Sequence, residues 1–446
     1  MRVASPRRIG IIAGGRSLPR EIAESLVGRG AQVVILAIEG EASAALDVFS
    51  PVKVNIGELG RIVRTLKQAG CVEVIVVGHV TRPDLASIKP DLGFFRALPT
   101  VLRLVRAGGD DAVLRGVIAF FEERGLKIVS PVMVAPELVI DGGAFGALRS
   151  RADDAPDIQL GLEVIGKLAV FDIGQAVVVT GGRIETIEAA EGTDGMLDRL
   201  TARRHSIMRQ GRVGPGDERP RGVLVKRPKP GQDLRVDLPV IGPDTVRRVV
   251  GADLGGIAVE AGRVLAAERS ELIRLADAHG VFVEGALPTE GAPDAGTETA
   301  SRPTAAIGRV RQLGRRRIAK ADAADILKSG MVIVTLEPYG AGRAVVVVAG
   351  HVLAVEAGEG AIPVIERAAI LQQWGRRRWR RAGAAVVSVG RDATPDVLER
   401  ARDAGLAGVA VVLKPFAASV PQSTIELADR LGLFIAAYER GEGEGA

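Results

Sequence analysis

Apolar and polar positions alternate in blocks that predict strands and helices in turn along the first part of the chain. Residues 9–15 form an apolar run that ends in two glycines, and residues 16–30 carry apolar side chains at helical spacing. Residues 31–38 are a β-branched run, as expected for a strand buried on both faces. Because a second such cycle follows over residues 57–80, the pattern predicts a parallel sheet with right-handed crossovers.

Two strands of this predicted sheet end in candidate binding turns. The first ends at Gly14 and Gly15, and a later one ends at Gly78 and His79. Ligands of parallel sheets bind outside the carboxyl ends of strands. The glycine spacing differs from the dinucleotide fingerprint G-x-G-x-x-G. The first pair is therefore either a tight strand–helix turn or a turn whose N–H groups approach a nucleotide phosphate.

The first domain is predicted to close with a helix and a strand. Asp110 and Asp111 stand at the helix start, where they either complement the helix dipole or take part in metal or nucleotide binding. Residues 126–134 predict the strand, and we assign residues 1–140 to a Rossmann-like nucleotide-binding domain. Residues 141–157 are rich in glycine and aspartate and are interpreted as an interdomain linker.

Residues 158–285 predict a second α/β domain. A helix over 158–171 precedes an alternating stretch centred on Gly181–Gly182, which predicts a β-hairpin. Residues 201–220 are expected to form a loop, and strands and helices alternate after it. Residues 286–303 are rich in Pro, Gly, Thr and Glu, and this composition predicts a flexible linker.

The chain then repeats itself. Residues 342–367 reproduce the pattern of 174–199 at an offset of 168, and residues 395–411 reproduce 243–259 at an offset of 152. Residues 304–440 are therefore predicted to be a duplicate of the second α/β domain.

The duplicate keeps the apolar framework but loses polar residues. At the offset of 152, Val389 stands opposite Asp237. Glu188 and Glu191 keep a glutamate at the matching position, which indicates a structural role for both. The polar residues of the first copy without a matching residue in the duplicate are Thr193, Asp194, Lys226, Lys229 and Gln232. We interpret the duplicate as a copy of the fold without the chemistry.

Composition narrows the class of protein. The chain has 446 residues, of which 47% are hydrophobic, enough for several buried cores. Its single cysteine, Cys71, excludes an intrachain disulfide and favours a reducing, cytoplasmic location. No apolar run is long enough to predict a transmembrane helix, and the N-terminus does not resemble a signal peptide.

The net charge of +5 includes two arginine runs, within residues 315–317 and 376–381. Basic runs attract phosphates, so these either face solvent, dock onto the first copy or contact anionic lipid at the inner membrane. Neither zinc-finger spacing nor an RNA-binding aromatic signature accompanies them, and no nucleic-acid partner is expected.

Candidate chemistry lies in the carboxylates and lysines of the first copy. No nucleophile elbow, Walker loop, HExxH motif or Cys–His pair is present. Carboxylates bind hard cations and lysines hold phosphate oxygens, a set that suits Mg²⁺-dependent chemistry on phosphates. Asp237 is the sharpest candidate, as a catalytic or a turn-forming carboxylate. The other candidates of this kind are Asp172, Glu188, Glu191, Asp194, Asp233, Lys226 and Lys229.

Several ordered motifs in residues 8–285 resemble the LpxI family, the UDP-2,3-diacylglucosamine pyrophosphatases of lipid A biosynthesis. The motifs are GIIAGGRSLP, the GDD at 109–111, DIGQAVVV, EAAEGTD, LVKRPKPGQD and VDLPVIGPDTV. Arg16 departs from the pattern because a third glycine often stands there. The duplicate is not part of the family core.

The resemblance implies Mg²⁺-dependent hydrolysis of a UDP-linked diacylated sugar to 2,3-diacylglucosamine 1-phosphate (lipid X) and UMP. It implies that Asp237 is the catalytic aspartate, while metal ligands and oligomeric state are left unassigned. The residues expected to bind the substrate are Gly14, Gly15, Leu18, Gly78, His79, Asp172, Gln175, Thr193, Asp194, Lys226, Lys229 and Gln232. Two alternatives stay open, a nucleotide-dependent oxidoreductase that uses Glu39 and a non-catalytic protein that binds sugar nucleotides or lipids.

Overall fold

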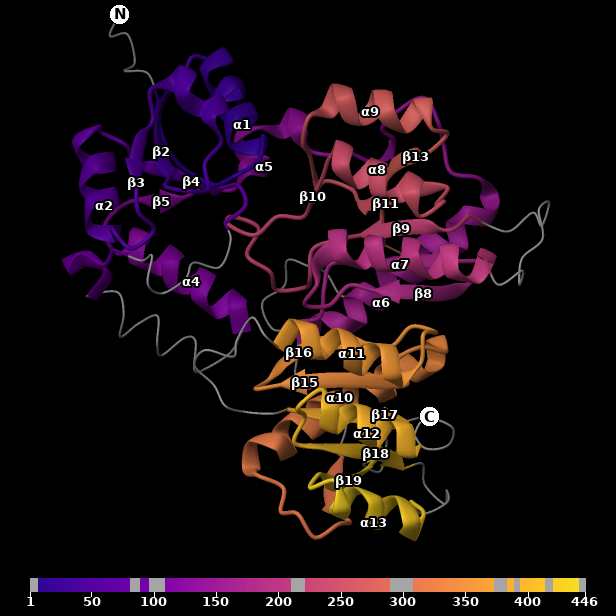
Figure 1. The fold of residues 1–446 in the computed structure, drawn as a ribbon. Helices are drawn as coiled ribbons and strands as arrows, with labels where there is room; N and C mark the ends of the chain where they lie inside the picture. The colour runs from indigo at the N-terminus through magenta and orange to yellow at the C-terminus, as the bar shows by residue number, and fades with distance from the viewer. Residues whose placement is uncertain are drawn as a thin grey trace, which may run out of the picture.

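The structure is a computed structural model, and it describes residues 7–80, 89–95, 109–209, 221–288, 308–372, 383–388, 394–413 and 420–440. Figure 1 shows an indigo N-terminal domain beside the magenta first copy of the second domain, with the orange and yellow duplicate packed against that copy. The mixture of helices with largely parallel sheets confirms the predicted α/β class.

The N-terminal sheet is parallel and has the order β3-β2-β1-β4-β5. Its strands are β1 (Arg8–Ala13), β2 (Gln32–Ile38), β3 (Val52–Val54), β4 (Glu73–Val77) and β5 (Lys127–Ile128). Its helices are α1 (Leu18–Gly28), η1 (Ala44–Phe49), α2 (Leu59–Gln68), α4 (Gly109–Glu122), α5 (Pro131–Val134) and η2 (Pro136–Leu138). Apolar side chains of α1 and α5 pack on one face of this sheet, and those of α2 and α4 pack on the other.

The order of this sheet reverses between β1 and β4, so the loops that follow these two strands border the crevice where open α/β sheets bind ligands. Both candidate turns predicted above follow these strands. Helix α4 begins at Gly109, which places Asp110 and Asp111 in its first turn as predicted. Their side chains lie outside the described part of the structure.

The sheet of the first copy has the order β13-β11-β9-β7-β8. Its strands are β7 (Ala176–Thr180), β8 (Arg183–Ile187), β9 (Val223–Lys226), β11 (Gly256–Glu260) and β13 (Phe282–Ala286), with the short β6 (Gly143–Ala144), β10 (Val240–Ile241) and β12 (Leu265–Ala266) outside it. The predicted hairpin is confirmed, because β7 and β8 pair antiparallel around Gly181–Gly182. The helices are η3 (Ala152–Asp154), α6 (Ala155–Leu168), η4 (Ala169–Phe171), α7 (Gly192–Arg209), α8 (Pro243–Gly251) and α9 (Arg269–Ala278).

Two predictions for this copy were wrong in part. Residues 201–209 belong to α7, whose buried Met196, Leu197 and Leu200 anchor the helix before its polar end. Segment 141–157 is not simply a linker, because the Phe145 N–H donates to the Val283 carbonyl at 2.8 Å and α6 begins within the segment. Tertiary pairing supplies this order, which composition did not show.

The duplicate has the sheet order β14-β19-β18-β17-β15-β16, which is the order of the first copy with one extra edge strand. Its strands are β14 (Arg309–Gln312), β15 (Ala344–Val348), β16 (His351–Val355), β17 (Ala384–Ser388), β18 (Gly408–Leu413) and β19 (Phe434–Glu439). Its helices are α10 (Lys320–Leu336), η5 (Glu337–Tyr339), α11 (Ala361–Gln372), α12 (Pro395–Asp403) and α13 (Gln422–Arg430). Even the irregularity of the hairpin register recurs, at Val178/Val179 and at Val346/Val347.

A buried aspartate fixes the hairpin in each copy. The Asp157 carboxylate accepts the N–H groups of Gly181 and Gly182 at 2.7 and 2.6 Å. Asp325 accepts those of Ala349 and Gly350 at 3.0 and 2.7 Å. Helices α6 and α10, which carry these aspartates, are thereby tied to the turns of the strands they cover.

Replacing Asp157 with alanine should lower the free energy of unfolding of the full chain by about 3 kcal/mol, because two buried N–H groups lose a charged acceptor. Urea denaturation followed by circular dichroism measures this change. The matched substitution Asp403→Ala removes an exposed carboxylate paired with Arg402 and should cost less than about 1 kcal/mol. Equal effects of the two substitutions would contradict the structural role of Asp157.

Candidate active site

The candidate site lies at one edge of the first copy's sheet. Because β7 runs antiparallel to both β8 and β9, the ends of β8 and β9 and the start of β7 meet at the same edge. Glu188 follows β8, Lys226 ends β9, and Gln175 precedes β7. The topology therefore brings together residues that are far apart in the sequence.

Lys226 and Glu188 are joined through a hydroxyl group. The Lys226 Nζ donates to Thr193 Oγ1 at 3.1 Å and to the Val240 carbonyl at 3.1 Å. Thr193 Oγ1 in turn donates to Glu188 Oε2 at 3.1 Å, and the Gln175 N–H donates to the same oxygen at 3.2 Å. Since Lys226 is only 8% exposed, this chain of contacts is withdrawn from water.

Burial favours the neutral forms of Glu188 and Lys226, the two ends of this series of hydrogen bonds. It raises the pKa of Glu188, against the attraction of Lys226. It also lowers the pKa of Lys226, opposed by Glu188 and Asp194 and assisted by Arg16. Asp237 is a further carboxylate whose charge raises the Lys226 pKa. Lys226 is thus the centre of a cluster of opposite charges, the kind of environment in which functional groups are found.

The loop after β9 is anchored by a buried arginine. Arg227 is 1% exposed, its Nε lies 2.8 Å from Glu260, and its Nη1 donates to the Leu162 carbonyl at 2.9 Å. Residues 227–238, which carry the remaining candidates of this region, therefore leave the sheet in a fixed direction. The sequence pattern had offered no role for Arg227.

Hydrogen bonds within this loop hold Asp237 in place. The Lys229 N–H donates to Gln232 Oε1 at 2.8 Å, and Gln232 Nε2 donates to the Asp237 carbonyl oxygen at 2.9 Å. The Lys229 ammonium pairs with Asp172, which has a left-handed backbone with φ of 56°. Asp233 is engaged by Arg235 at 2.6 Å, so its carboxylate closes a local turn.

The glycines of the N-terminal domain serve a close backbone crossing. The Gly15 N–H donates to the His79 carbonyl at 2.7 Å, and the His79 N–H donates back to Gly15 at 3.1 Å. A side chain at Gly14 would come within 2.5 Å of the His79 carbonyl. These contacts support the tight-turn interpretation of Gly14 and Gly15, since the Gly14 N–H also donates, to Val77 at 2.8 Å. Leu18, another candidate, is 6% exposed and packs in the core.

Arg16 connects the glycine turn of the N-terminal domain to the candidate site on the first copy. It adopts φ of 69°, a conformation that favours glycine, which accounts for the glycine pattern from which it departs. Its guanidinium lies 3.3 Å from Asp194, which also lies 3.6 Å from Arg248. The sequence analysis assigned no role to Arg16. The signal that could have indicated its contact with Asp194 is a positive charge directly after the glycine turn.

The equivalent edge of the duplicate lacks the lysine and the threonine. In the first copy Ala176 pairs with Lys226, whereas the matching Ala344 pairs with Val387. The position of Thr193 is taken by Ala361. The carboxylate of Glu356, which corresponds to Glu188, accepts the backbone N–H groups of Arg343, Gly358 and Gly360. Val389, which sequence comparison set opposite Asp237, lies outside the described residues.

The duplicate nevertheless approaches the rim of the site. Lys328 on α10 donates to the Gly350 carbonyl at 2.7 Å. Burial lowers the pKa of Lys328, and the negative charge of Asp172 opposes that shift while Lys229 adds to it. An ammonium group of the second copy therefore lies within electrostatic reach of the Lys229–Asp172 pair of the first.

Within the described residues, no group of three or more His, Cys, Asp and Glu side chains is arranged to hold a metal ion. Mg²⁺ is commonly held by one or two carboxylates together with substrate phosphates. Asp194 and Asp237 beside Lys226 fit that mode, in which the substrate supplies the remaining oxygens. Among the described residues, no helix has the length and apolarity needed to cross a bilayer.

Largely parallel sheets between helices, with a cluster of buried and paired charges at strand ends, place the chain among α/β proteins with a candidate active site. The family description "LpxI N-terminal domain" matches residues 8–138, and "LpxI C-terminal domain" matches residues 141–284 and again 310–436. The chain is 39% identical to the UDP-2,3-diacylglucosamine pyrophosphatase LpxI of Caulobacter vibrioides over 284 residues, which are 64% of this chain and 99% of that protein. The chain belongs to the LpxI family, which confirms the resemblance, and it is longer than that relative by the duplicated domain.

Replacing Lys226 with methionine should destabilise the protein by about 4 kcal/mol near neutral pH, because Glu188 loses its buried cation. The pKa of Glu188 in the folded variant should rise further above its unfolded value, so the folded state retains a proton that the unfolded chain releases. The decrease in the free energy of unfolding should therefore grow as pH rises from about 4 to 8. Urea denaturation across this range measures it. The double variant Lys226→Met with Glu188→Gln should lose that added pH dependence; if it does not, the two groups are not coupled.

Proposed function

We propose that this chain hydrolyses the pyrophosphate bond of UDP-2,3-diacylglucosamine, giving 2,3-diacylglucosamine 1-phosphate (lipid X) and UMP. The observation that carries the proposal is the match to nearly the whole length of a relative named for this substrate. The family domains matched over residues 8–138 and 141–284 include the Lys226 cluster. The duplicate, which matches the same family domain, has Val387 at the register position of Lys226.

The charges of the site suit attack of water on a phosphorus atom. The water oxygen forms a new P–O bond while the bond from phosphorus to the bridging oxygen breaks, and negative charge collects on the phosphate oxygens. We assign the stabilisation of that charge to the cations Lys226 and Arg16, and a supporting role to Lys229, whose ammonium group pairs with Asp172. We assign to Asp237 the positioning of the water and the acceptance of its proton.

Mg²⁺ fits this chemistry as a Lewis acid on the phosphate oxygens, and its requirement is part of the proposal. Asp194 and Asp237 are the residues that would hold it together with the substrate. The uridine diphosphate end is proposed to lie over the carboxyl ends of β1 and β4, with the acylated sugar toward the first copy. Arg16, which follows the β1 turn and pairs with Asp194, links these two regions.

A cytoplasmic location with peripheral contact at the inner membrane belongs to the same proposal, since the substrate carries acyl chains. Arg315 projects from the duplicate with a side chain that is 95% exposed, as a membrane contact requires. The second arginine run, residues 376–381, lies outside the described residues.

Replacing Asp237 with alanine should lower kcat at least a hundredfold, a barrier increase of about 2.7 kcal/mol, because the attacking water loses its carboxylate. The assay follows UMP and lipid X release from detergent-dispersed substrate with Mg²⁺. Asp244→Ala, which removes an exposed carboxylate of α8, is the matched control and should leave kcat unchanged. A kcat for Asp237→Ala within tenfold of the wild-type value would contradict the assignment.

Replacing Arg16 with alanine should raise KM for the substrate about tenfold, because a cation near the phosphates and the link to Asp194 are both lost. The control Arg20→Ala removes an exposed arginine of α1 that pairs with Glu24. Steady-state kinetics of the two variants distinguish the specific effect of Arg16 on KM from the effect of removing any one positive charge from the domain. Equal KM values for both would argue against substrate binding across the two edges.

A further inference from the structure

The two copies share one hydrophobic core. Helices α6 and α10 contact each other between the two sheets, and Figure 1 shows the duplicate stacked on the first copy along this face. The core is built from matching positions 168 residues apart, which include Ile158 and Ile326, Ile165 and Ile333, Leu168 and Leu336, Val177 and Val345, Val179 and Val347, and Ile187 and Val355. Equivalent faces of the first copy and of the duplicate are therefore in contact.

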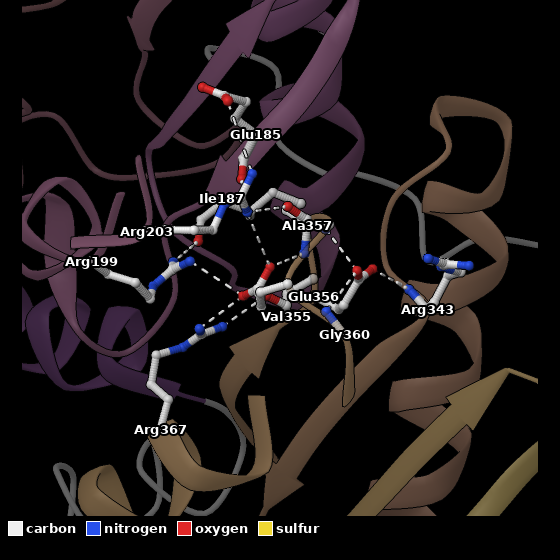
Figure 2. A network of polar contacts seen from close by, with 12 residues as sticks. Glu185, Ile187, Arg199, Arg203, Arg343, Val355, Glu356, Ala357, Gly360 and Arg367 are labelled. Atoms are coloured by element: carbon white, nitrogen blue, oxygen red, sulfur yellow. Dashed lines mark hydrogen bonds and ion pairs between the residues drawn. The ribbon is translucent and has the colours of Figure 1, made fainter. Parts of the chain in front are cut away.

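Polar contacts at the edge of this core repeat the symmetry. Arg199 lies 2.7 Å from Glu191 of its own copy and 3.3 Å from Glu359 of the other. Arg367 lies 2.9 Å from Glu359 of its own copy and 3.7 Å from Glu191 of the other. Each residue of one copy matches a residue of the other at the offset of 168. In Figure 2, Arg199 lies above Arg367, and the dashed contacts of the two side chains meet between the copies.

A contact of each arginine with the backbone of its own copy also repeats. Arg199 donates to the Ile187 carbonyl at 3.3 Å, and Arg367 donates to the equivalent Val355 carbonyl at 2.9 Å. A twofold interface between identical chains has this character, because a residue i that contacts j on the partner requires that j contacts i. The reciprocal ion pairs therefore have the form of an interface between identical partners. Two other contacts across the interface lack a counterpart, because Arg203 corresponds to Leu371, and Tyr339, which donates to Glu163, corresponds to Phe171.

The two glutamates of this cluster are buried, so their charges depend on the arginines paired with them. The side chains of Glu191 and Glu359 are 9% and 7% exposed. Burial alone would raise the pKa of Glu359, but Arg367 and Arg199 lower it. Without the opposite copy, each glutamate would keep its own arginine but lose the second one, and the apolar face of α6 would meet water.

We propose that the duplicate stands in the place of a second subunit, and that the first copy's face formed by α6, Glu191 and Arg199 is a self-association surface. A chain that ends after Pro288 pairs with a second copy of itself through this face. In that pair Arg203, which here donates to the Ala357 carbonyl at 3.0 Å, meets the equivalent Ala189 carbonyl of the second copy. In the full chain the duplicate already covers the surface.

The pairing also supports the candidate site. Glu191 lies between Glu188 and Thr193 in the segment that joins β8 to α7, so the opposite copy holds the segment that supplies two groups of the Lys226 network. This part of the proposal rests on the proposed function, whereas the association itself does not. Mass measurements and activity measurements therefore test the two separately.

The test is sedimentation equilibrium of residues 1–288. This segment should fold alone, because a relative of the same family is covered over 99% of its length by 284 residues of this chain, and three apolar clusters lie wholly within the segment. The expected result is twice the mass of one chain, with hydrolysis retained. A folded fragment with the mass of one chain at all concentrations overturns the proposal, even if it remains active.

Charge reversal locates the surface. Arg199→Glu in residues 1–288 should abolish the dimer, because four carboxylates then meet at its centre. The control Arg274→Glu changes an exposed residue of α9, which covers the other face of the sheet, and should leave the dimer intact. The double variant Glu191→Arg with Arg199→Glu restores alternating charges and should recover the dimer, also where the single variant folds poorly. A dimer unaffected by Arg199→Glu, or no recovery in a folded double variant, overturns the assignment. In the full chain Arg199→Glu should leave the mass unchanged.

Discussion

The burial of α6 and α10 between two sheets is the constraint on which the rest of the C-terminal structure depends. Each sheet is covered on its other face by helices of its own copy, α7 to α9 in the first and α11 to α13 in the second. Helices α6 and α10 lie between the inner faces, and the side chains of both copies form one cluster there. The inner face of each copy is covered by the other copy, so hydrophobic burial holds the duplicate against the first copy.

This arrangement explains how the duplicate can lack Lys226 and Thr193 while its fold persists. The core positions of the two copies match at an offset of 168 in the first half of the domain and of 152 in the second half, whereas Lys226 has Val387 at its register position. Packing constrains apolar residues on both faces of the sheet, but nothing in the packing requires a lysine at the end of a strand. Glu188 and its counterpart Glu356 both accept the N–H of the residue before β7 or β15, which gives the glutamate a structural use in either copy.

The site, by contrast, depends on contacts between domains. Arg16 comes from the N-terminal domain and reaches Asp194 of the first copy. Ser130 of the same domain donates to the Leu234 carbonyl at 2.8 Å, which tethers the loop before Asp237. A substrate with a nucleotide at one end and acyl chains at the other matches a site divided in this way, and both domains of the family are present in the chain.

The sequence by itself determined the order of strands and helices, the hairpin at Gly181–Gly182 and the duplication, because hydrophobic periodicity and glycine placement act locally. It also singled out Lys226 and Thr193, which differ between the copies. Only the tertiary structure decided that they share one hydrogen-bonded chain with Glu188, that Arg227 is a buried anchor, and that the duplicate packs on the first copy through Glu191 and Glu359. Such contacts join residues on different strands and copies, and they depend on strand order and on the shared core, which no local pattern encodes.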